Sequence, residues 1–214
     1  MNKSDNNLVY SSRWISPTQL LYYRIITFLV IGFTVVSNRI LRILEGEGFN
    51  NMHYFSMQNL YFLFFWFMLA LLWRNNQNLY NKLQGKLRGA FLSYTLVVTT
   101  VYYGLLYESS TGLDGYNDWI IHLCSTLLFI IDFILSESQH YDWSYSLIWL
   151  IYPVIYLVYS IIYDSLYSEP IYGFLAMDPL SGYIIWVIML LVVFFLFGLL
   201  WIFLNHLLVR TESE

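Results

Sequence analysis

Charged side chains are scarce in this sequence. Aspartate, glutamate, lysine and arginine make up 11% of its 214 residues, whereas soluble domains carry about 25%. Apolar residues reach 58% and gather in runs of about 20 residues, the length that a helix needs to cross a bilayer. This composition predicts one membrane domain with several spans, and it leaves no length for a separate soluble domain.

Cysteine is nearly absent, and the motifs of several enzyme classes are missing. The single cysteine, Cys124, excludes a disulfide within the chain. His53 and His206 have no histidine, cysteine or carboxylate three or four residues away, and His140 has only Glu137, so the sequence offers no cluster of metal ligands. We find no P-loop, dinucleotide fingerprint, nucleophile elbow or zinc-protease motif, and the basic residues form no stripe suited to nucleic acid. The sequence therefore predicts no metal, no cofactor and no nucleic-acid partner.

Six apolar segments are present, and most of them begin or end with a tyrosine or a tryptophan. Such rings favour the membrane–water interface. The expected fold is therefore an all-α, integral membrane six-helix bundle. We divide the chain into a cytoplasmic N-terminal segment (1–21), a six-span transmembrane domain (22–204) and a cytoplasmic C-terminal tail (205–214). The six segments are residues 22–43, 54–73, 90–107, 119–135, 145–163 and 183–204.

Basic residues gather at one end of the predicted bundle. With six spans, eight of the ten lysine and arginine residues fall at the end that holds both termini, and only Arg39 and Arg42 fall at the other. The positive-inside rule then predicts that both termini are cytoplasmic. The opposite end is acidic. The eight basic residues are Lys3, Arg13, Arg24, Arg74, Lys82, Lys86, Arg88 and Arg210.

The connection between the fifth and sixth spans, DSLYSEPIYGFLAMDPLSGY, is about 20 residues long and still rather apolar. Loops of this length are often functional. Two interpretations stand side by side. The stretch 169–182 is either a partial lid on the membrane surface or an ordinary interfacial connector.

A serine and a histidine are predicted at the same depth in the membrane. Ser56 and Asn59 lie in the first turns of the second segment, on one helix face because they are three residues apart. His122 lies in the first turn of the fourth segment, which starts at the same side, so its depth should match that of Ser56 within about one helical turn, ~5 Å. A serine becomes a nucleophile when an adjacent base takes its proton, and neutral imidazole is such a base. The alternative is that both residues are packing and hydrogen-bonding groups between helices.

Two acidic residues flank His122 in the same segment. Asp118 precedes it by four residues and could orient the ring, as the acid of a triad does. Asp132 lies ten residues further on, about 15 Å along the helix axis. We interpret Asp132 as a buried polar contact between helices.

Polar residues of the first segment give weaker signals. Thr34, Ser37 and Asn38 in FTVVSNRI are interpreted as helix-packing residues. Arg39 and Arg42 follow at the outer end of the segment. They either bind an anionic headgroup or a substrate carboxylate, or they extend to the interface without a ligand.

Four stretches resemble segments of the androgen-induced-gene family of multipass membrane hydrolases and of its prokaryotic six-span relatives. FSMQNLYF resembles the family segment in which a hydroxyl residue precedes asparagine or aspartate by three positions. WIIHLCSTLLFIIDFIL resembles the segment with a histidine ten residues before an acid. LIWLIYPVIYLVYSIIY resembles the fifth span, and IYGFLAMDPLSGY resembles the Tyr-x-Phe-Leu stretch of the outer loop. The likeness covers nearly the whole chain in the order and spacing of its spans.

The resemblance implies an activity and a site. Animal members of the family are threonine hydrolases that cleave fatty acid esters of hydroxy fatty acids, using an intramembrane threonine and a histidine. The histidine matches His122 and the threonine matches Ser56, so this chain departs from the family in carrying its hydroxyl on a serine. Thr34 is the alternative nucleophile if the register differs. The prokaryotic relatives imply a location in the plasma membrane of a prokaryote.

We therefore expect an intramembrane lipid ester hydrolase whose pocket opens to the outer leaflet and whose substrate enters from the bilayer. Ser56 is the expected nucleophile, His122 the base and Asn59 a donor to the oxyanion. Two other functions stay open. One is a non-catalytic lipid-binding or scaffold protein, and the other is a small transporter, for which we see no paired broken helices in the sequence.

Overall fold

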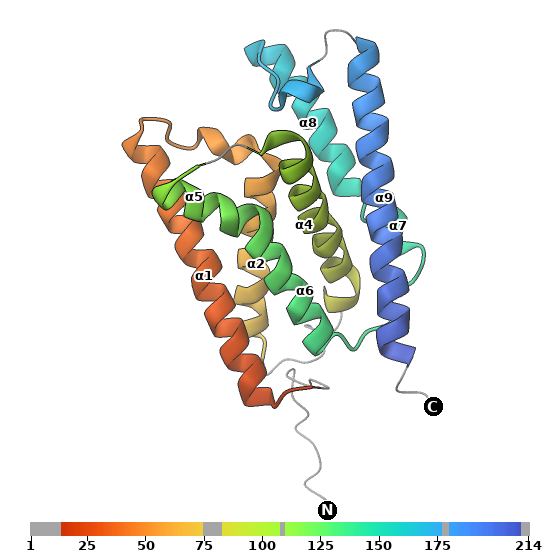
Figure 1. Ribbon diagram of the computed structural model, residues 1–214. Coiled ribbons are helices and arrows are strands. Elements are labelled where there is room, and N and C mark those ends of the chain that lie inside the picture. The colour runs from red at the N-terminus through yellow and green to blue at the C-terminus, as the bar shows by residue number, and fades with distance from the viewer. Residues whose placement is uncertain (1–13, 75–82, 108–109, 177–179, 211–214) are drawn as a thin grey trace, which may run out of the picture.

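The computed structural model describes residues 14–74, 83–107, 110–176 and 180–210, and its regular elements within these ranges are all helical (Figure 1). Three short segments are π-helical: η2 (Gln84–Arg88), η3 (Tyr102–Leu106) and η4 (Ile120–Cys124). Two are 3₁₀ turns: η1 (Asn50–His53) and η5 (Gly173–Leu175). The α-helices are α1 (Pro17–Leu44), α2 (Phe55–Leu72), α4 (Gly89–Val101), α5 (Gly112–Trp119), α6 (Ser125–Ser136), α7 (Tyr145–Ile148), α8 (Ile151–Tyr167) and α9 (Leu180–Arg210).

Six helical stretches are long and apolar enough to cross a membrane, which confirms the predicted six-helix bundle. Their outward faces expose large apolar side chains, for example Leu29 at 61% and Ile185 at 65%. Continuous apolar surface of this kind fits lipid rather than water, so the chain is an integral, multipass membrane protein. The stretches are Pro17–Leu44, Phe55–Leu72, Lys86–Leu106, Gly112–Ser136, Tyr145–Tyr167 and Leu180–Val209.

The first helix begins earlier than the predicted segment. α1 starts at Pro17 rather than at residue 22 because Ser16 caps it. The Ser16 hydroxyl accepts a hydrogen bond from the Gln19 N–H at 3.2 Å, and the Gln19 side chain accepts one from the Ser16 N–H at 2.8 Å. A reciprocal cap followed by proline at the first helical position is a strong helix start. Residues 1–13 of the predicted N-terminal segment lie outside the described residues.

The last helix continues beyond residue 204, where the predicted transmembrane domain ends, and reaches Arg210. Asn205 is fully buried. Its side chain accepts from the Tyr141 N–H and donates to the Gln139 carbonyl, both at 2.8 Å. These hydrogen bonds give partners to two backbone groups of the connection after α6, so Asn205 packs as part of the bundle. The final residues of the predicted tail, 211–214, lie outside the described part of the chain.

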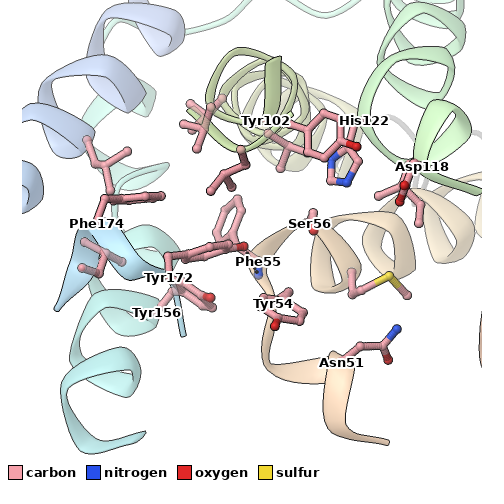
Figure 2. Close-up of a pocket in the computed structure, with 18 of the residues that line it drawn as sticks. Asn51, Tyr54, Phe55, Ser56, Tyr102, Asp118, His122, Tyr156, Tyr172 and Phe174 are labelled. Atoms are coloured by element: carbon pink, nitrogen blue, oxygen red, sulfur yellow. Dashed lines mark hydrogen bonds between the residues drawn. The ribbon is translucent and has the colours of Figure 1, made fainter. Parts of the chain in front are cut away.

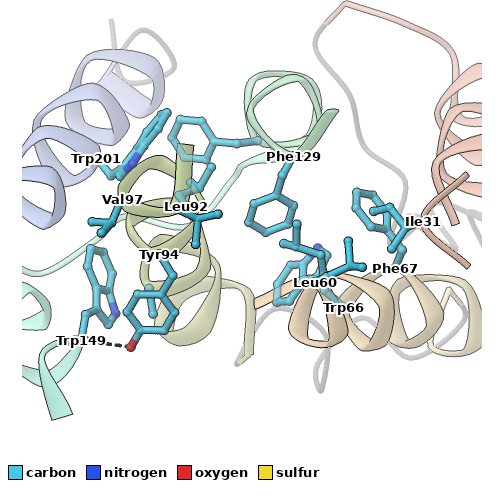
Figure 3. Close-up of a cluster of buried hydrophobic side chains, with 14 of the residues drawn as sticks. Ile31, Leu60, Trp66, Phe67, Leu92, Tyr94, Val97, Phe129, Trp149 and Trp201 are labelled. Atoms are coloured by element: carbon cyan, nitrogen blue, oxygen red, sulfur yellow. Dashed lines mark hydrogen bonds between the residues drawn. The ribbon is translucent and has the colours of Figure 1, made fainter. Parts of the chain in front are cut away.

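The centre of the bundle is an aromatic core. α4 contacts α2, α6 and α9 and so lies in the middle. From α2, Trp66 and Phe67 meet Phe129 of α6 edge-on, each with ring centroids 5.9 Å apart (Figure 3). Edge-to-face pairs are a favoured arrangement of aromatic rings, and here they join α2 to α6.

The fifth span is broken, which the sequence pattern did not indicate. α7 ends at Ile148 and α8 begins at Ile151, with Trp149 in the turn between them. The Trp149 carbonyl accepts from the Tyr94 hydroxyl at 2.7 Å, and its indole N–H donates to the Lys86 carbonyl at 2.8 Å. Partners on the third span therefore satisfy the polar groups of the break.

Close packing at this break gives a first testable prediction. A Cβ added at Gly89 would lie 2.0 Å from the Trp149 ring. The hydrogen bond from the indole N–H to the Lys86 carbonyl holds this ring in place. Gly89→Ala should therefore lower the free energy of unfolding by about 1–3 kcal/mol through overpacking, measured by thermal unfolding in detergent. Gly198→Ala is the matched control, because its Cβ would meet the same ring at an ordinary 3.5 Å. Equal stability of both variants would contradict the packing described here.

A network of buried charges joins three spans at the end of the bundle that holds the start of α1. Asp132 of α6 pairs with Arg24 of α1 at 2.8 Å and also with Arg88. Arg88 pairs in addition with Glu137 at 3.3 Å. All three side chains in the Asp132 pairs are 0% exposed. Asp132 is thus a buried polar contact between helices, as predicted.

Two basic residues that support the predicted orientation belong to this network. They are Arg24 and Arg88, two of the eight basic residues at the end predicted to be cytoplasmic. Their charges are neutralised by buried carboxylates rather than directed at lipid headgroups. The start of α1 and the end of α9 do lie at the same end of the bundle (Figure 1), as an even number of spans requires.

Candidate active site

A pocket of about 390 Å³ lies at the opposite end of the bundle from the start of α1, a size typical of small-molecule sites. Its walls combine an apolar group with a polar group of side chains. The apolar group includes Val97, Val98, Val101, Leu157, Leu175, Leu190 and Phe194. The polar group comprises Asn38, Arg42, Glu47, Asn51, Ser56, Asp118 and His122, together with the tyrosines Tyr54, Tyr102, Tyr156 and Tyr172.

Ser56 lines this pocket from the first turn of α2. The helix begins at Phe55 after the 3₁₀ turn η1, and its N-cap, Tyr54, makes no side-chain cap. The first N–H groups of such a helix need other partners. The Phe55 N–H donates to the Tyr172 hydroxyl at 3.1 Å. Ser56 therefore sits at the positive end of a helix dipole, which favours negative charge that develops beside it.

His122 lines the same pocket from the π-helical segment η4. Its ring stacks on Tyr102 with centroids 3.6 Å apart and planes 3° from parallel, and Tyr102 itself belongs to the π-helical segment η3. The His122 carbonyl accepts from the Thr99 hydroxyl at 2.5 Å, which ties the two spans together. The ring nitrogen Nδ1 has no hydrogen-bond partner among the described residues. Single π-helical turns inside α-helices are frequent at functional sites.

The structure brings Ser56 and His122 to one pocket at the same end of the bundle. Figure 2 shows both side chains at the same space, from two different helices. Within the described residues no hydrogen bond joins them directly. The arrangement places a hydroxyl, an imidazole side chain and a helix N-terminus around a shared cavity, and acyl transfer uses groups of these types.

Asp118 lines the pocket but does not hold the ring of His122. Its carboxylate accepts from the Ser110 hydroxyl at 2.5 Å. The predicted alignment of Asp118 with His122 assumed a regular α-helix. The π-helical segment η4 begins at Ile120, between the two, and its wider turn shifts residues four apart out of line.

Asn59 and Thr34 lie away from the pocket. Asn59 is 1% exposed, and it is not among the residues that line the cavity, so its predicted role as oxyanion donor does not fit the geometry. Thr34 is fully buried, and its hydroxyl donates to the Val30 carbonyl within α1 at 3.0 Å. Thr34 does not line the cavity either, so the geometry favours Ser56 over it.

Both arginines near the C-terminal end of α1 already have partners. Arg39 donates to the Gly48 carbonyl at 2.6 Å and to the Tyr61 hydroxyl at 3.2 Å. Arg42 pairs with acidic side chains and does line the pocket. A substrate carboxylate would have to displace these contacts. The carboxylate partners of Arg42 are Glu45 at 2.7 Å, Glu47 at 3.3 Å and Asp114 at 3.7 Å.

Tyr172 is the residue that sequence reasoning missed. It belongs to the connection between α8 and α9, from which Phe174 and Leu175 also line the pocket. Burial raises the pKa of Tyr172 to about 12, although the Phe55 N–H and the nearby Ser56 lower it in part. The hydroxyl therefore keeps its proton at neutral pH. Tyr172, Phe174 and Leu175 thus form part of the pocket wall, the lid interpretation of 169–182 stays a prediction, and residues 177–179 lie outside the described ranges.

No known protein family, no curated protein and no solved structure matches this chain. The site combines a serine at a helix N-terminus, a histidine on a π-helical turn and a tyrosine from the connection between α8 and α9 around one cavity (Figure 2).

Proposed function

We propose that this protein is an intramembrane lipid ester hydrolase with Ser56 as its nucleophile and His122 as its general base. The observation that carries the proposal is that a hydroxyl at a helix N-terminus and an imidazole with an unpartnered nitrogen line one pocket. The many apolar side chains of that pocket suit an acyl chain. The resemblance in FSMQNLYF and WIIHLCSTLLFIIDFIL supports the same two residues.

In the proposed reaction, His122 takes the proton of the Ser56 hydroxyl while the serine oxygen attacks the ester carbonyl. The bond between the carbonyl carbon and the leaving alcohol then breaks, and His122 gives its proton to that alcohol. Water attacks the acyl group on Ser56 with His122 again as the base. One ester and one water thus yield one fatty acid and one alcohol.

The oxyanion of this reaction needs donors that are already in place. Tyr172 supports this role better than Asn59, because its protonated hydroxyl lies at the start of α2 and close enough to Ser56 to affect its own pKa. The dipole of α2 adds a favourable field at the same point. We therefore propose Tyr172 and the N-terminus of α2 as the oxyanion site.

Removal of this hydroxyl gives a second prediction. Tyr172→Phe should lower kcat for ester hydrolysis by about 10²-fold or more, the usual cost of one oxyanion donor, with little change in KM. Tyr167→Phe is the control, because Tyr167 is exposed at 65% and does not line the cavity. Equal kcat values in the two variants would exclude Tyr172 from the oxyanion site.

The direct test of the function is turnover by the purified protein. Liposomes that contain the protein and a fluorogenic long-chain ester should release the alcohol, and Ser56→Ala liposomes prepared in the same way should not. Release that is equal in both preparations would contradict the proposal.

One observation favours a second function, that of a non-catalytic lipid-binding or scaffold protein. The His122 ring stacks face to face on Tyr102 at 3.6 Å, and no hydrogen bond within the described residues joins it to Ser56. A histidine held for packing would show these features. A folded protein that binds lipid and turns over no ester would support this alternative.

We further propose that both termini face the cytoplasm and that the pocket opens outward, in the plasma membrane of a prokaryote. The excess of basic residues at the end that holds the start of α1 supports this orientation. In this arrangement the substrate enters from the outer leaflet.

Cysteine labelling in intact cells tests the orientation and is a third prediction. On a Cys124→Ala background, a cysteine at Tyr167, which is exposed near the pocket end, should react with an impermeant maleimide added outside. A cysteine at Arg74, which is exposed at the other end, should react only after the cells are opened. The reverse pattern would overturn the orientation.

A further inference from the structure

A buried pair of amides lines the pocket and has an unused acceptor. Asn38 at the end of α1 and Asn51 in η1 are 5% and 8% exposed, and both line the cavity. The Asn51 amide donates to the Asn38 side-chain oxygen at 2.6 Å. The Asn51 side-chain oxygen is buried and has no partner. A buried acceptor without a donor is costly, and a donor on a ligand would remove that cost.

The charges around this pair oppose an anion. Arg42 is the one cation among the pocket-lining residues that the structure describes, and Glu45, Glu47 and Asp114 already surround it. Asp118 adds a further carboxylate to the pocket wall. With Arg39 counted beside Arg42, these four carboxylates and two guanidinium groups give this end of the pocket, its acidic rim, two net negative charges.

From these two observations we propose that the alcohol part of the substrate is uncharged and carries a free hydroxyl, as in a monoacylglycerol, and that this hydroxyl donates to Asn51. The inference rests on the proposed hydrolase function and narrows its substrate class. It disfavours the free carboxylate of the hydroxy fatty acid esters that the sequence resemblance implied. A carboxylate has no proton to offer Asn51 at neutral pH, and the acidic rim repels it.

Uncleavable ethers separate recognition from catalysis. We would measure the binding of three oleyl ethers to the full-length protein in nanodiscs, by displacement of a labelled oleyl glycerol ether. The three share one chain and differ only in the head: glycerol, a carboxylate (oleyloxyacetate) or choline. The glycerol ether should bind at least about tenfold more tightly than the carboxylate ether, because a site built to bond a hydroxyl rejects a ligand that lacks one. Equal or tighter binding of the carboxylate or choline ether would overturn the inference.

Variants of the rim test the named contacts. Asn51→Ala should weaken binding of the glycerol ether about fivefold or more and change binding of the choline ether little. Asn50→Ala is the matched control, because Asn50 is the exposed neighbour outside the pocket lining. Glu47→Gln should narrow the gap between the glycerol and carboxylate ethers by about twofold to fivefold, and most at low salt. Unchanged selectivity in both Asn51→Ala and Glu47→Gln would contradict the proposed contacts.

The same ligands distinguish failure of this inference from failure of the proposed function. Selective ether binding without hydrolysis of the corresponding glycerol ester would support recognition of a hydroxyl head group and contradict the proposed hydrolase function. Hydrolysis that depends on Ser56 but proceeds equally with the glycerol, glycolate and choline esters of oleate would support the hydrolase function. It would contradict the inference that the site selects a hydroxyl head group.

Discussion

Ser56→Ala is expected to reduce ester hydrolysis by about 10⁴-fold or more, because loss of a nucleophile removes the covalent route altogether. His122→Ala should cost a similar factor, since the serine hydroxyl is weak without its base. The double variant should be about as inactive as either single one, because residues that act as a unit do not contribute additively. The measurement is kcat/KM on one lipid ester in liposomes, with insertion checked for each variant.

Two further substitutions sharpen this prediction. Ser56→Thr should retain activity, because the family that the sequence resembles uses a threonine. Asp118→Asn should lower the rate less than tenfold, since Asp118 accepts from Ser110 and makes no hydrogen bond to His122 within the described residues. Full turnover by Ser56→Ala would remove the assignment, and Thr34→Ala would then be the next variant to measure.

Asp132→Asn is expected to produce the largest loss of stability, about 3–5 kcal/mol. Asp132 is the carboxylate shared by Arg24 and Arg88, and all three side chains are 0% exposed. Its neutralisation would leave two buried cations with Glu137 as the remaining carboxylate of the network. Removing one partner of a buried ion pair strongly lowers the free energy of unfolding, because the other charge stays buried without compensation. Thermal unfolding of the purified variants in detergent measures the loss.

An exposed ion pair is the control for this loss. Glu45 pairs with Arg42 at 2.7 Å, but the Glu45 side chain is 40% exposed. Glu45→Gln should therefore change the free energy of unfolding by about 1 kcal/mol at most. A Tm of Asp132→Asn that matches those of wild type and Glu45→Gln would show that the buried network does not hold the spans together.

The six spans could be predicted because membrane insertion depends on run length and composition, which the sequence shows directly. Their ends were less predictable. The start of α1 depends on a local capping box at Ser16, whereas the extension of α9 depends on the distant contacts of Asn205 with the connection after α6. The break at Trp149 likewise depends on partners in the third span, so its sequence neighbours do not reveal it.

Topology alone predicts that Ser56 and His122 lie at equal depth, since spans that start at the same membrane face place their first turns there. It does not predict that both side chains line one pocket, which depends on how the helices are arranged around it. The role of Asp118 was not predictable, because the π-helical turn at Ile120–Cys124 changes the register and leaves no mark in composition. Tyr172 could not be found either. Its contact with Phe55 joins residues 117 positions apart, and only the folded connection between α8 and α9 brings them together.

Arg24 and Arg88 are a further case in which the sequence alone does not reveal a residue's role. The sequence presents them as basic residues near the ends of apolar segments, which is how cytoplasmic anchors look. The folded chain directs both guanidinium groups to the shared carboxylate of Asp132. Partners on other spans, and not the residues themselves, decide whether such a charge is structural.

The central claim is that Ser56 is an activated nucleophile, and covalent labelling tests it most directly. The folded wild-type protein, incubated in liposomes with a long-chain fluorophosphonate and digested, should yield an adduct that peptide mass spectrometry maps to Ser56. Labelling should fall strongly in His122→Ala and remain in Ser56→Thr, now on the threonine. An unlabelled Ser56 in folded wild-type protein, or labelling that His122→Ala leaves unchanged, would contradict the account.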